Sequence, residues 1–182
     1  LTIGYPDKTM VSDIDFQVNK NDRVAIIGPN GIGKSTLLKT IMKKLEPKDG
    51  SIKYGASLDI GYYDQELQSL DPSKTVLDTI WDRHKTMPEK DVRSILASFL
   101  FTAEDIDKTV GQLSGGQKAR LTLTVLSLEK DNFLLMDEPT NHLDIEAKEV
   151  LEQALDNYDG TLLFVSHDRY FINELANKII SV

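Results

Sequence analysis

The sequence predicts an α/β fold: a mostly parallel central sheet flanked by helices, a small antiparallel β part and an inserted helical lobe. Short apolar runs of strand length alternate with segments whose apolar residues recur at helical spacing. A glycine-rich turn joins the first of these runs to the first helical pattern, and a polar stretch with helical pieces, 66–112, interrupts the alternation. Such alternation is typical of parallel strands covered by helices.

The individual elements follow from the same patterns. Four apolar runs predict strands buried on both faces of the sheet: 24–27, 133–136, 162–165 and 178–182. Five segments with helical spacing predict helices: 35–45, 76–85, 91–101, 145–158 and 169–176. The β-rich stretch 50–65 alternates and turns at Gly55, which predicts the small antiparallel sheet there.

The composition fits one globular domain and excludes several classes. The 182 residues are 40% hydrophobic and contain no cysteine, which excludes disulfides and thiolate metal sites and fits a reducing cytoplasm. There is no signal-peptide pattern, and no apolar run approaches the ~20 residues that cross a bilayer. The net charge of -8 argues against direct nucleic-acid binding, which would need a local basic patch or a segment outside this chain.

The segment GPNGIGKST, residues 28–36, matches G-x-x-x-x-G-K-[ST] between a predicted strand and a predicted helix. Its glycines let the backbone N–H groups converge into an anion nest at the helix start. Lys34 can reach the β- and γ-phosphates of a nucleotide, Ser35 is placed to bind Mg²⁺, and Thr36 is expected to bond a phosphate. The predicted phosphate-binding residues are Gly28, Asn30, Gly31, Gly33, Lys34, Ser35 and Thr36.

Two adjacent acids, Asp137 and Glu138, end the apolar run 133–136. Nucleotide-bound Mg²⁺ needs a carboxylate at the end of a neighbouring strand, and Asp137 is placed for that role. Glu138 would point elsewhere as the strand ends, toward the water that attacks the γ-phosphate, and would act as its base. Alone such a pair is usually an ordinary strand end; together with the glycine loop it predicts catalysis.

A second anion site is predicted at LSGGQ, residues 113–117, before an apolar helical pattern. Ser114 is placed as the N-cap, and Gly115 and Gly116 expose backbone N–H groups at the helix start. Since the first loop already supplies a nucleotide pocket, this second cradle is predicted to serve a nucleotide held by another copy.

GPNGIGKST, LSGGQ and LLMDEP together resemble the nucleotide-binding domain of ATP-binding cassette (ABC) proteins over essentially the whole chain. The resemblance implies a P-loop NTPase fold that binds ATP and Mg²⁺ and hydrolyses ATP. It implies one cassette over residues 1–182, with an ATP-binding core at 1–65 and 113–182 and a helical subdomain at 66–112.

The resemblance also implies roles for single residues. Gln65 matches the Q-loop glutamine, which joins the helical lobe to Mg²⁺ and the attacking water, and Tyr5 takes the place of the aromatic that stacks on adenine. His167 matches the switch histidine that contacts the γ-phosphate, and Asp144 matches the D-loop aspartate that crosses to the opposite subunit. Gln117 completes the LSGGQ motif. Without the resemblance, Gln65, Tyr5 and His167 would be taken as a loop residue, a partly buried aromatic and a structural histidine.

DEPTNHLD (137–144) and SHDRYF (166–171) are most similar to the ABC-F group, soluble paired cassettes that act on the ribosome. Transporter cassettes more often carry a small residue in place of His142, and the helical insertion here is short. ABC-F proteins carry two cassettes in one chain, so this chain is expected to be a fragment of a longer cytoplasmic protein. Its expected partners are a second cassette, in the same chain or a homodimer, and the ribosome.

The resemblance implies a head-to-tail pair in which Ser114 and Gly116 of one cassette cover ATP bound by the other. ATP then acts as glue and hydrolysis as a timer. An ATPase subunit of a membrane transporter stays open as the alternative. The head of a DNA-repair or chromosome-structure protein is disfavoured, because no sustained heptads separate Lys34 from Leu113. The sequence does not distinguish a translation factor from an antibiotic-resistance factor, or the first cassette from the second.

Overall fold

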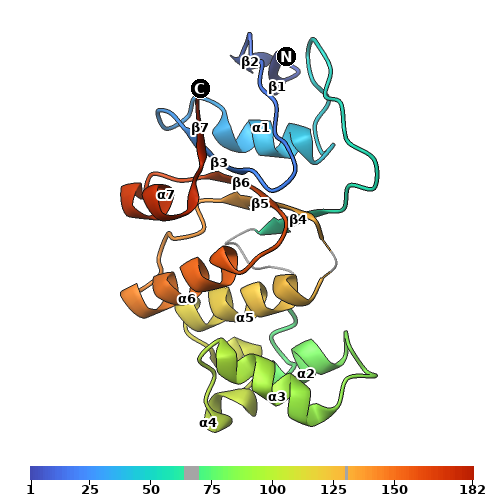
Figure 1. Ribbon diagram of the computed structural model, residues 1–182, viewed down its shortest axis with the longest axis vertical. Coiled ribbons are helices and arrows are strands. Elements are labelled where there is room, and N and C mark those ends of the chain that lie inside the picture. Colours follow the sequence, from blue (N-terminus) through green and yellow to red (C-terminus); the bar gives the residue numbers. More distant parts are fainter. Residues whose placement is uncertain (64–69, 130) are drawn as a thin grey trace. The chain divides into compact units, whose positions relative to one another are not determined.

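The computed structural model describes residues 1–63, 70–129 and 131–182 (Figure 1). The described residues fall into two compact units. The sheet unit comprises Leu1–Asp64, Asp131–Pro139 and Asp159–Val182, and the helical unit comprises Gln65–Lys130 and Thr140–Tyr158.

The sheet unit is built on a parallel sheet with the strand order β4-β5-β6-β3-β7 in the described residues. The strands are β3 (Arg23–Ile27), β4 (Ile60–Tyr63), β5 (Phe133–Asp137), β6 (Thr161–Val165) and β7 (Lys178–Ser181). Helices α1 (Lys34–Ile41) and α7 (Arg169–Leu175) belong to the same unit. A separate antiparallel hairpin pairs β1 (Ile3–Tyr5) with β2 (Lys8–Val11).

The central strands are buried on both faces, which explains their continuous apolar sequences. β6 is buried at every position, and β3 and β5 are buried except at their ends. Phe171 of α7 stands edge-on to Phe164 of β6, with ring centroids 5.2 Å apart, and both side chains are fully buried. This aromatic pair anchors α7 immediately after the end of β6.

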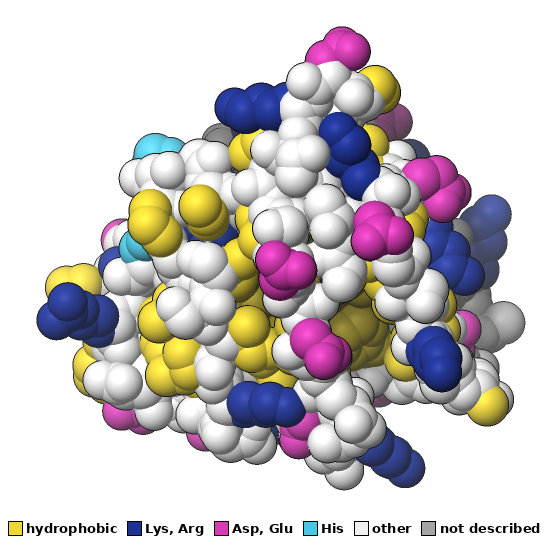
Figure 2. Space-filling model, turned by 90° about the horizontal axis from the view of Figure 1, so that it is seen from above, with side chains coloured by type: hydrophobic (Ala, Val, Ile, Leu, Met, Phe, Trp, Pro, Cys, Tyr) yellow, Lys and Arg dark blue, Asp and Glu magenta, His cyan; other side chains and the backbone are white. Residues whose placement is uncertain are grey.

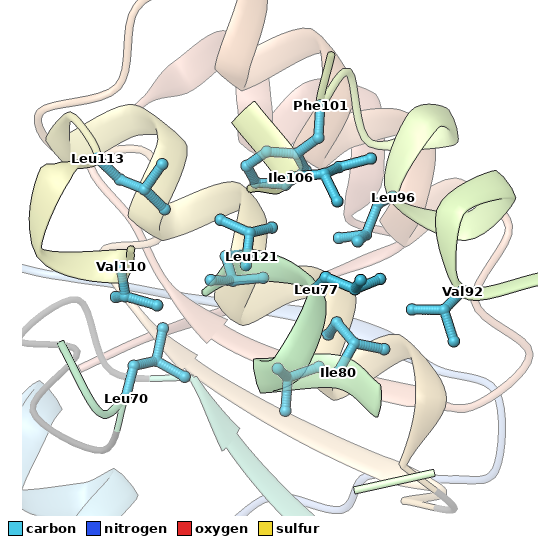
Figure 3. Packing of buried hydrophobic residues seen from close by; sticks show 12 residues of the cluster. Leu70, Leu77, Ile80, Val92, Leu96, Phe101, Ile106, Val110, Leu113 and Leu121 are labelled. Carbon is cyan, nitrogen blue, oxygen red and sulfur yellow. The ribbon is translucent and has the colours of Figure 1, made fainter. Parts of the chain in front are cut away.

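The helical unit packs several helices around one apolar core. The described helices are α2 (Val76–Trp81), α3 (Glu89–Ser98), α4 (Ala103–Ile106), the 3₁₀ turn η1 (Val110–Gln112), α5 (Gly115–Leu128) and α6 (Ile145–Asp156). Figure 3 shows Leu121 of α5 at the centre of this core, facing side chains from α2, α4 and η1. Leu121 of α5, Ile80 of α2 and Leu96 of α3 are fully buried in this core. Helices α2 and α3 therefore pack against the same core as α5.

The predicted α/β class with a mostly parallel sheet is confirmed, but three local predictions are wrong. The run 178–182 forms a strand, β7, yet its residues alternate between half-buried and exposed instead of being buried on both faces. Helix α1 ends at Ile41 instead of residue 45, because Lys43 has a left-handed backbone with φ 61° that no α-helix continues. The antiparallel sheet expected at 50–65 is absent from the described part of that stretch. Residues 51–59 form no strand, and β4 runs parallel to β5 in the main sheet; the antiparallel pair is β1 with β2.

The compact units divide the chain at other points than the predicted core and helical subdomain, and that subdomain division stays a prediction. Helices α5 and α6 lie in the helical unit, whereas the predicted core included residues 113–182. None of the described helices combines the length and the hydrophobicity that a membrane crossing requires. On the face seen in Figure 2, Lys and Arg side chains are interspersed with Asp and Glu.

Candidate functional site

Three of the predicted site segments leave the parallel sheet at the same edge. In-register pairing places Val165 of β6 opposite both Ile26 of β3 and Asp137 of β5. The residues that follow these strands, namely the glycine loop, Glu138 and His167, therefore start from one level of the sheet. Open parallel sheets bind their ligands at this carboxyl edge.

The glycine loop, residues 28–33, turns from β3 directly into α1. Gly33 adopts φ 124°, and a Cβ there would lie 2.9 Å from Cγ2 of Val11 and 3.0 Å from Cβ of Met10. Both the backbone and the neighbouring strand β2 therefore require glycine. Among the described side chains none caps the start of α1, so its first N–H groups are available to an anion.

Lys34 brings the positive charge into this loop. The residue is only 6% exposed, and its ammonium group donates to the carbonyl oxygens of Gly28 and Pro29, each at 2.7 Å. An ammonium has three N–H donors, and charge-assisted bonds to phosphate are stronger than bonds to neutral carbonyls. The loop thus presents a fixed cation and a helix start to the same ligand.

The hydroxyl residues after Lys34 differ in exposure. Ser35 and Asn30 are exposed, whereas Thr36 is 5% exposed. Ser35 is accessible to a ligand or metal at the loop. The phosphate contact expected of Thr36 stays a prediction and would have to be made through a small accessible surface.

Glu138 leaves the strand in an unusual backbone conformation. Its φ is 47°, in the left-handed region that only a few per cent of non-glycine residues occupy. Its N–H group donates to the carbonyl oxygen of Val165 at 2.8 Å, which extends the ladder between β5 and β6 by one bond. The chain therefore turns between Asp137 and Glu138, and the two carboxylates leave it in different backbone conformations.

The carboxylate of Glu138 meets His167. Its Oε1 lies 3.2 Å from Nε2 of the imidazole, and its Oε2 accepts a long bond, 3.4 Å, from the His167 backbone N–H. The side chain of Glu138 is 20% exposed and that of His167 is 48% exposed. His167 thus holds the carboxylate at two points while part of its own ring faces solvent.

The environment of Glu138 changes its acidity. Burial raises the pKa of Glu138 above its ordinary value, and the charge of Asp137 acts in the same direction. His167, through its charge and its backbone N–H, and Lys34 oppose this rise. A carboxylate with a raised pKa accepts a proton more readily near neutral pH, as a general base must.

The residues on either side of His167 fix its backbone. Ser166 is 1% exposed, and its hydroxyl accepts from the Asp168 N–H at 3.1 Å. Asp168 is the N-cap of α7 and accepts from the Phe171 N–H at 3.1 Å. The first of these bonds spans His167 at the end of a buried strand, and the second fixes the start of α7 just after it, so together they favour a single backbone conformation.

Tyr5 lies at the end of β1, next to the hairpin turn, and is 40% exposed. Lys48 donates to the carbonyl oxygens of Tyr5 and Pro6 at 3.2 and 3.4 Å. The second strand of the same hairpin touches the glycine loop, as the contact between Gly33 and Val11 shows. The ring is accessible for stacking, and its adenine role stays a prediction.

The described residues contain no group of three or more His, Asp or Glu side chains that could hold a metal by themselves. Mg²⁺ in nucleotide sites usually takes one or two protein ligands and completes its shell with phosphates and water. Ser35 and Asp137 suit that smaller set, since one is an accessible hydroxyl and the other a half-buried carboxylate at the sheet edge. The third predicted ligand, Gln65, lies outside the described residues.

In the helical unit, the LSGGQ segment forms the start of α5. Ser114 is the N-cap: its hydroxyl accepts from the Gln117 N–H at 3.2 Å, while Oε1 of Gln117 accepts from the Ser114 N–H at 3.0 Å. Gly115 is exposed, and a Cβ there would have nothing within 4 Å. The tip therefore offers bare backbone to a ligand, and the side chain of Gln117 is used to hold the tip.

Asp144 begins the neighbouring helix α6. Its Oδ1 accepts from the Ala147 N–H at 2.7 Å, so within this chain it serves as an N-cap. A Cβ on Gly116 would lie 3.8 Å from Cβ of Ala147, which places the starts of α5 and α6 in contact. The structure thus brings Asp144 and the LSGGQ tip together, and the crossing expected of Asp144 stays a prediction.

Sequence reasoning missed the residues that support the site. Asp168 and Ser166 fix His167, and Asp105 touches Gln117 through a bond of 3.5 Å. The signal for Asp105 was present as a T-x-x-D capping-box pattern, Thr102 to Asp105. Its link to Gln117 depends on tertiary packing and has no local signature.

A family model described as ABC transporter matches residues 11–141. YdiF of Bacillus subtilis is 52% identical and ABC transporter F family member 5 of Arabidopsis thaliana 40% identical, both over the whole chain, which covers 28% and 27% of those proteins. The energy-dependent translational throttle protein EttA of Mycobacterium tuberculosis is 37% identical over 98% of the chain, which covers 33% of it. The resemblance to the ABC-F group is confirmed, and the chain spans about a third or less of these relatives.

Solved structures agree on the fold. A Pyrococcus furiosus protein assigned as an ABC transporter ATP-binding protein superposes with a TM-score of 0.82 at 26% identity, covering the whole chain and 94% of that protein. An ATP-binding cassette solved as a dimer with ADP and phosphate gives a TM-score of 0.77 at 23% identity, covering the whole chain and 90% of the cassette. The second likeness concerns the fold alone.

Proposed function

The chain belongs to the ABC transporter family, and on this premise we propose that it is a cassette that binds ATP and hydrolyses it to ADP and phosphate. The observation that carries the proposal is the pairing of Glu138 with His167 at the sheet edge that also bears the Lys34 loop. A base, a group that positions it and a phosphate-binding loop are the parts that ATP hydrolysis requires.

The loop supplies binding. The N–H groups at the start of α1 and the ammonium of Lys34 hold the β- and γ-phosphates, and Tyr5 stacks on the adenine. Ser35 and Asp137 would hold Mg²⁺, with Gln65 as a further ligand. When bound, the metal neutralises charge on the phosphate oxygens.

Glu138 supplies the base. Its carboxylate removes the proton from the water that attacks the γ-phosphate, and burial raises its basicity for this step. His167 orients the carboxylate through the two contacts at 3.2 and 3.4 Å. The exposed part of the imidazole is then free to contact the γ-phosphate, the role expected of a switch histidine.

Two cassettes form the complete site in this proposal. The exposed tip of α5, with Ser114, Gly115 and Gly116, covers the nucleotide held by the facing cassette. The contact between the starts of α5 and α6 supports this idea, because it brings Asp144 to the same interface. ATP therefore closes the pair head to tail, and hydrolysis reopens it.

We propose that the whole protein uses this cycle as a timer on the ribosome, in the cytoplasm. The support is the similarity to an F family member and to EttA, whose name describes an energy-dependent throttle of translation. A translation factor and a ribosome-protecting antibiotic-resistance factor both fit this proposal.

The test uses the full-length protein with Glu138→Gln. Turnover should fall about 10²-fold or more while ATP binding persists, and the substituted protein should cosediment with ribosomes in a sucrose gradient when ATP is present. Lys34→Ala combined with Glu138→Gln is the control, because it removes the phosphate cation and should abolish the ATP-dependent sedimentation. Unchanged turnover in the Glu138→Gln protein would show that Glu138 is not the base.

The second candidate is the ATPase subunit of a membrane transporter, which the description of the matching family model favours. It predicts that the Glu138→Gln protein copurifies with a hydrophobic membrane partner and stays at the top of the ribosome gradient. The same preparation therefore separates the two functions.

A further inference from the structure

Three capping boxes follow one another in the residues that lead into α5, within the described part of the helical unit. They pair Thr102 with Asp105 at α4, Thr109 with Gln112 at η1, and Ser114 with Gln117 at α5. In each box the last residue returns its side chain to the backbone N–H of the first. Side chains thus close three successive turns in the residues before the LSGGQ tip.

Asp105 joins the first box to the third. It is 8% exposed; its Oδ2 accepts from the Thr102 N–H at 3.2 Å, and its Oδ1 accepts from Nζ of Lys108 at 3.1 Å and from Nε2 of Gln117 at 3.5 Å. The bond to Gln117 is long, but its acceptor carries a charge. The Thr102 N–H, followed by Lys108, holds the pKa of Asp105 below its ordinary value, so the carboxylate is ionised at neutral pH.

An ionised carboxylate can only accept hydrogen bonds. The side-chain amide of Gln117 must therefore turn its NH₂ group toward Asp105, which leaves Oε1 facing the Ser114 N–H at 3.0 Å. The reverse orientation would place the NH₂ group against that N–H and break the capping box. The charge of Asp105 thus favours the same amide orientation that the Ser114 N–H requires, and adds a second hold on the side chain that closes the tip of α5.

We propose that Asp105 is a positioning residue for ATP hydrolysis, acting through Gln117 to hold the backbone of Ser114 and Gly115 ready for the nucleotide of the facing cassette. The inference rests on the proposed ATPase function and adds a residue to it. Asp105 lies outside the LSGGQ segment and acts on the nucleotide only through Gln117.

The test compares variants of the full-length protein by kcat, ATP affinity and melting temperature. Asp105→Ala should lower kcat about three- to tenfold, the range expected for the loss of one hydrogen bond of ordinary net strength, because the bond to Gln117 is long. ATP affinity should stay within about twofold, because the phosphate loop of the same cassette is untouched. Thr102→Ala is the matched control: it removes the hydroxyl that caps α4 at 3.2 Å from the Asp105 N–H but leaves the carboxylate on Gln117. It should lower the melting temperature and keep kcat.

A charge exchange tests the link itself. Gln117→Glu alone places two carboxylates against each other and should lower kcat. Combined with Asp105→Asn, whose amide can donate to the introduced carboxylate while that carboxylate still accepts from the Ser114 N–H, it should recover most of the rate. Asp105→Asn also keeps the shape of the side chain, so the comparison holds if Asp105→Ala does not fold.

The outcomes are distinct. If Thr102→Ala lowers kcat as much as Asp105→Ala, or if the effects of Gln117→Glu and Asp105→Asn simply add, the positioning role is wrong. If the unsubstituted protein has no ATPase activity that Glu138→Gln removes, the proposed function itself fails. Wild-type kcat in Asp105→Ala overturns this inference alone.

Discussion

Glu138 and His167 face each other across the ends of two neighbouring parallel strands, with Oε1 of the carboxylate 3.2 Å from Nε2 of the imidazole. Glu138 reaches this position through a left-handed backbone, φ 47°, that is tied to β6 by the 2.8 Å bond from its N–H to the Val165 carbonyl. His167 is fixed by the hydrogen bonds of Ser166 and Asp168 on either side. The pair is therefore held from both strands before any ligand binds.

Replacing His167 by Ala should move the pH dependence of turnover. The charge and backbone N–H of His167 lower the pKa of Glu138 against the effect of burial. Removing the imidazole should raise that pKa further, and a base works only when it is ionised. The acid limb of kcat should therefore shift to higher pH, beyond any overall loss of rate. Steady-state assays over a pH series measure the shift.

His84→Ala is the control for that series. His84 follows α2 in the helical unit, whereas Glu138 and His167 belong to the sheet unit. The His84→Ala protein should therefore keep the wild-type pH profile. An acid limb that stays in place in His167→Ala would show that the imidazole does not set the ionisation of Glu138.

Glu138→Gln should stabilise the protein without nucleotide at neutral pH. Burial raises the pKa of Glu138 in the folded state, so the folded chain binds this proton more tightly than the unfolded chain. The raised pKa of Glu138 therefore contributes to the free energy of unfolding in full at pH values below the ordinary glutamate pKa. This contribution is lost as the pH rises through the pKa of Glu138 in the folded state. Glutamine is neutral throughout and keeps the same backbone, so its melting temperature should exceed wild type at neutral pH and approach it in acid.

Calorimetry at one neutral and one acidic pH checks this difference. Glu149→Gln, on the exposed side of α6, is the control, and it should change the melting temperature only slightly at either pH. A Glu138→Gln protein that melts below wild type at neutral pH would contradict the cost assigned to the buried carboxylate.

Gly33→Ala should destabilise the sheet unit and impair ATP binding. The new Cβ would meet Val11 and Met10 at 2.9 and 3.0 Å, in a backbone conformation that alanine rarely adopts. Strain of this kind costs on the order of 1–3 kcal/mol. Gly55→Ala is the matched control, because a Cβ there meets nothing within 4 Å. Thermal melts and nucleotide titrations of the two variants should diverge, and equal behaviour would show that the loop can relax.

Much of the fold was predictable because parallel strands that are buried on both faces have short, continuous apolar sequences. The expected runs 24–27, 133–136 and 162–165 each agree with β3, β5 and β6 to within one residue. The pairing of β4 was not predictable, since alternation indicates a strand but not its partner. The end of α1 was misplaced because apolar residues at helical spacing continue past Lys43, where the backbone turns left-handed.

Some parts of the candidate site could likewise be predicted from local sequence, and others could not. A local motif predicts the glycine loop, and its strand–loop–helix context follows from the neighbouring patterns. The left-handed Glu138 and its contact with His167 depend on the register of β5 and β6, which no short segment encodes. The link from Asp105 to Gln117 likewise depends on how α4 meets the start of α5.

Gly115→Ala separates packing from function at the tip of α5. A Cβ at Gly115 would have nothing within 4 Å, and alanine is favoured over glycine in helices by up to about 1 kcal/mol. The melting temperature should therefore stay or rise. If the bare backbone approaches the phosphates of a facing cassette, the added methyl group should nevertheless lower turnover of the full-length protein about tenfold or more.

Gly111→Ala is the opposite control. Its Cβ would lie 3.2 Å from the Pro72 carbonyl oxygen, so stability should fall while turnover per folded molecule persists. Wild-type turnover in Gly115→Ala would mean that this tip does not cover a nucleotide.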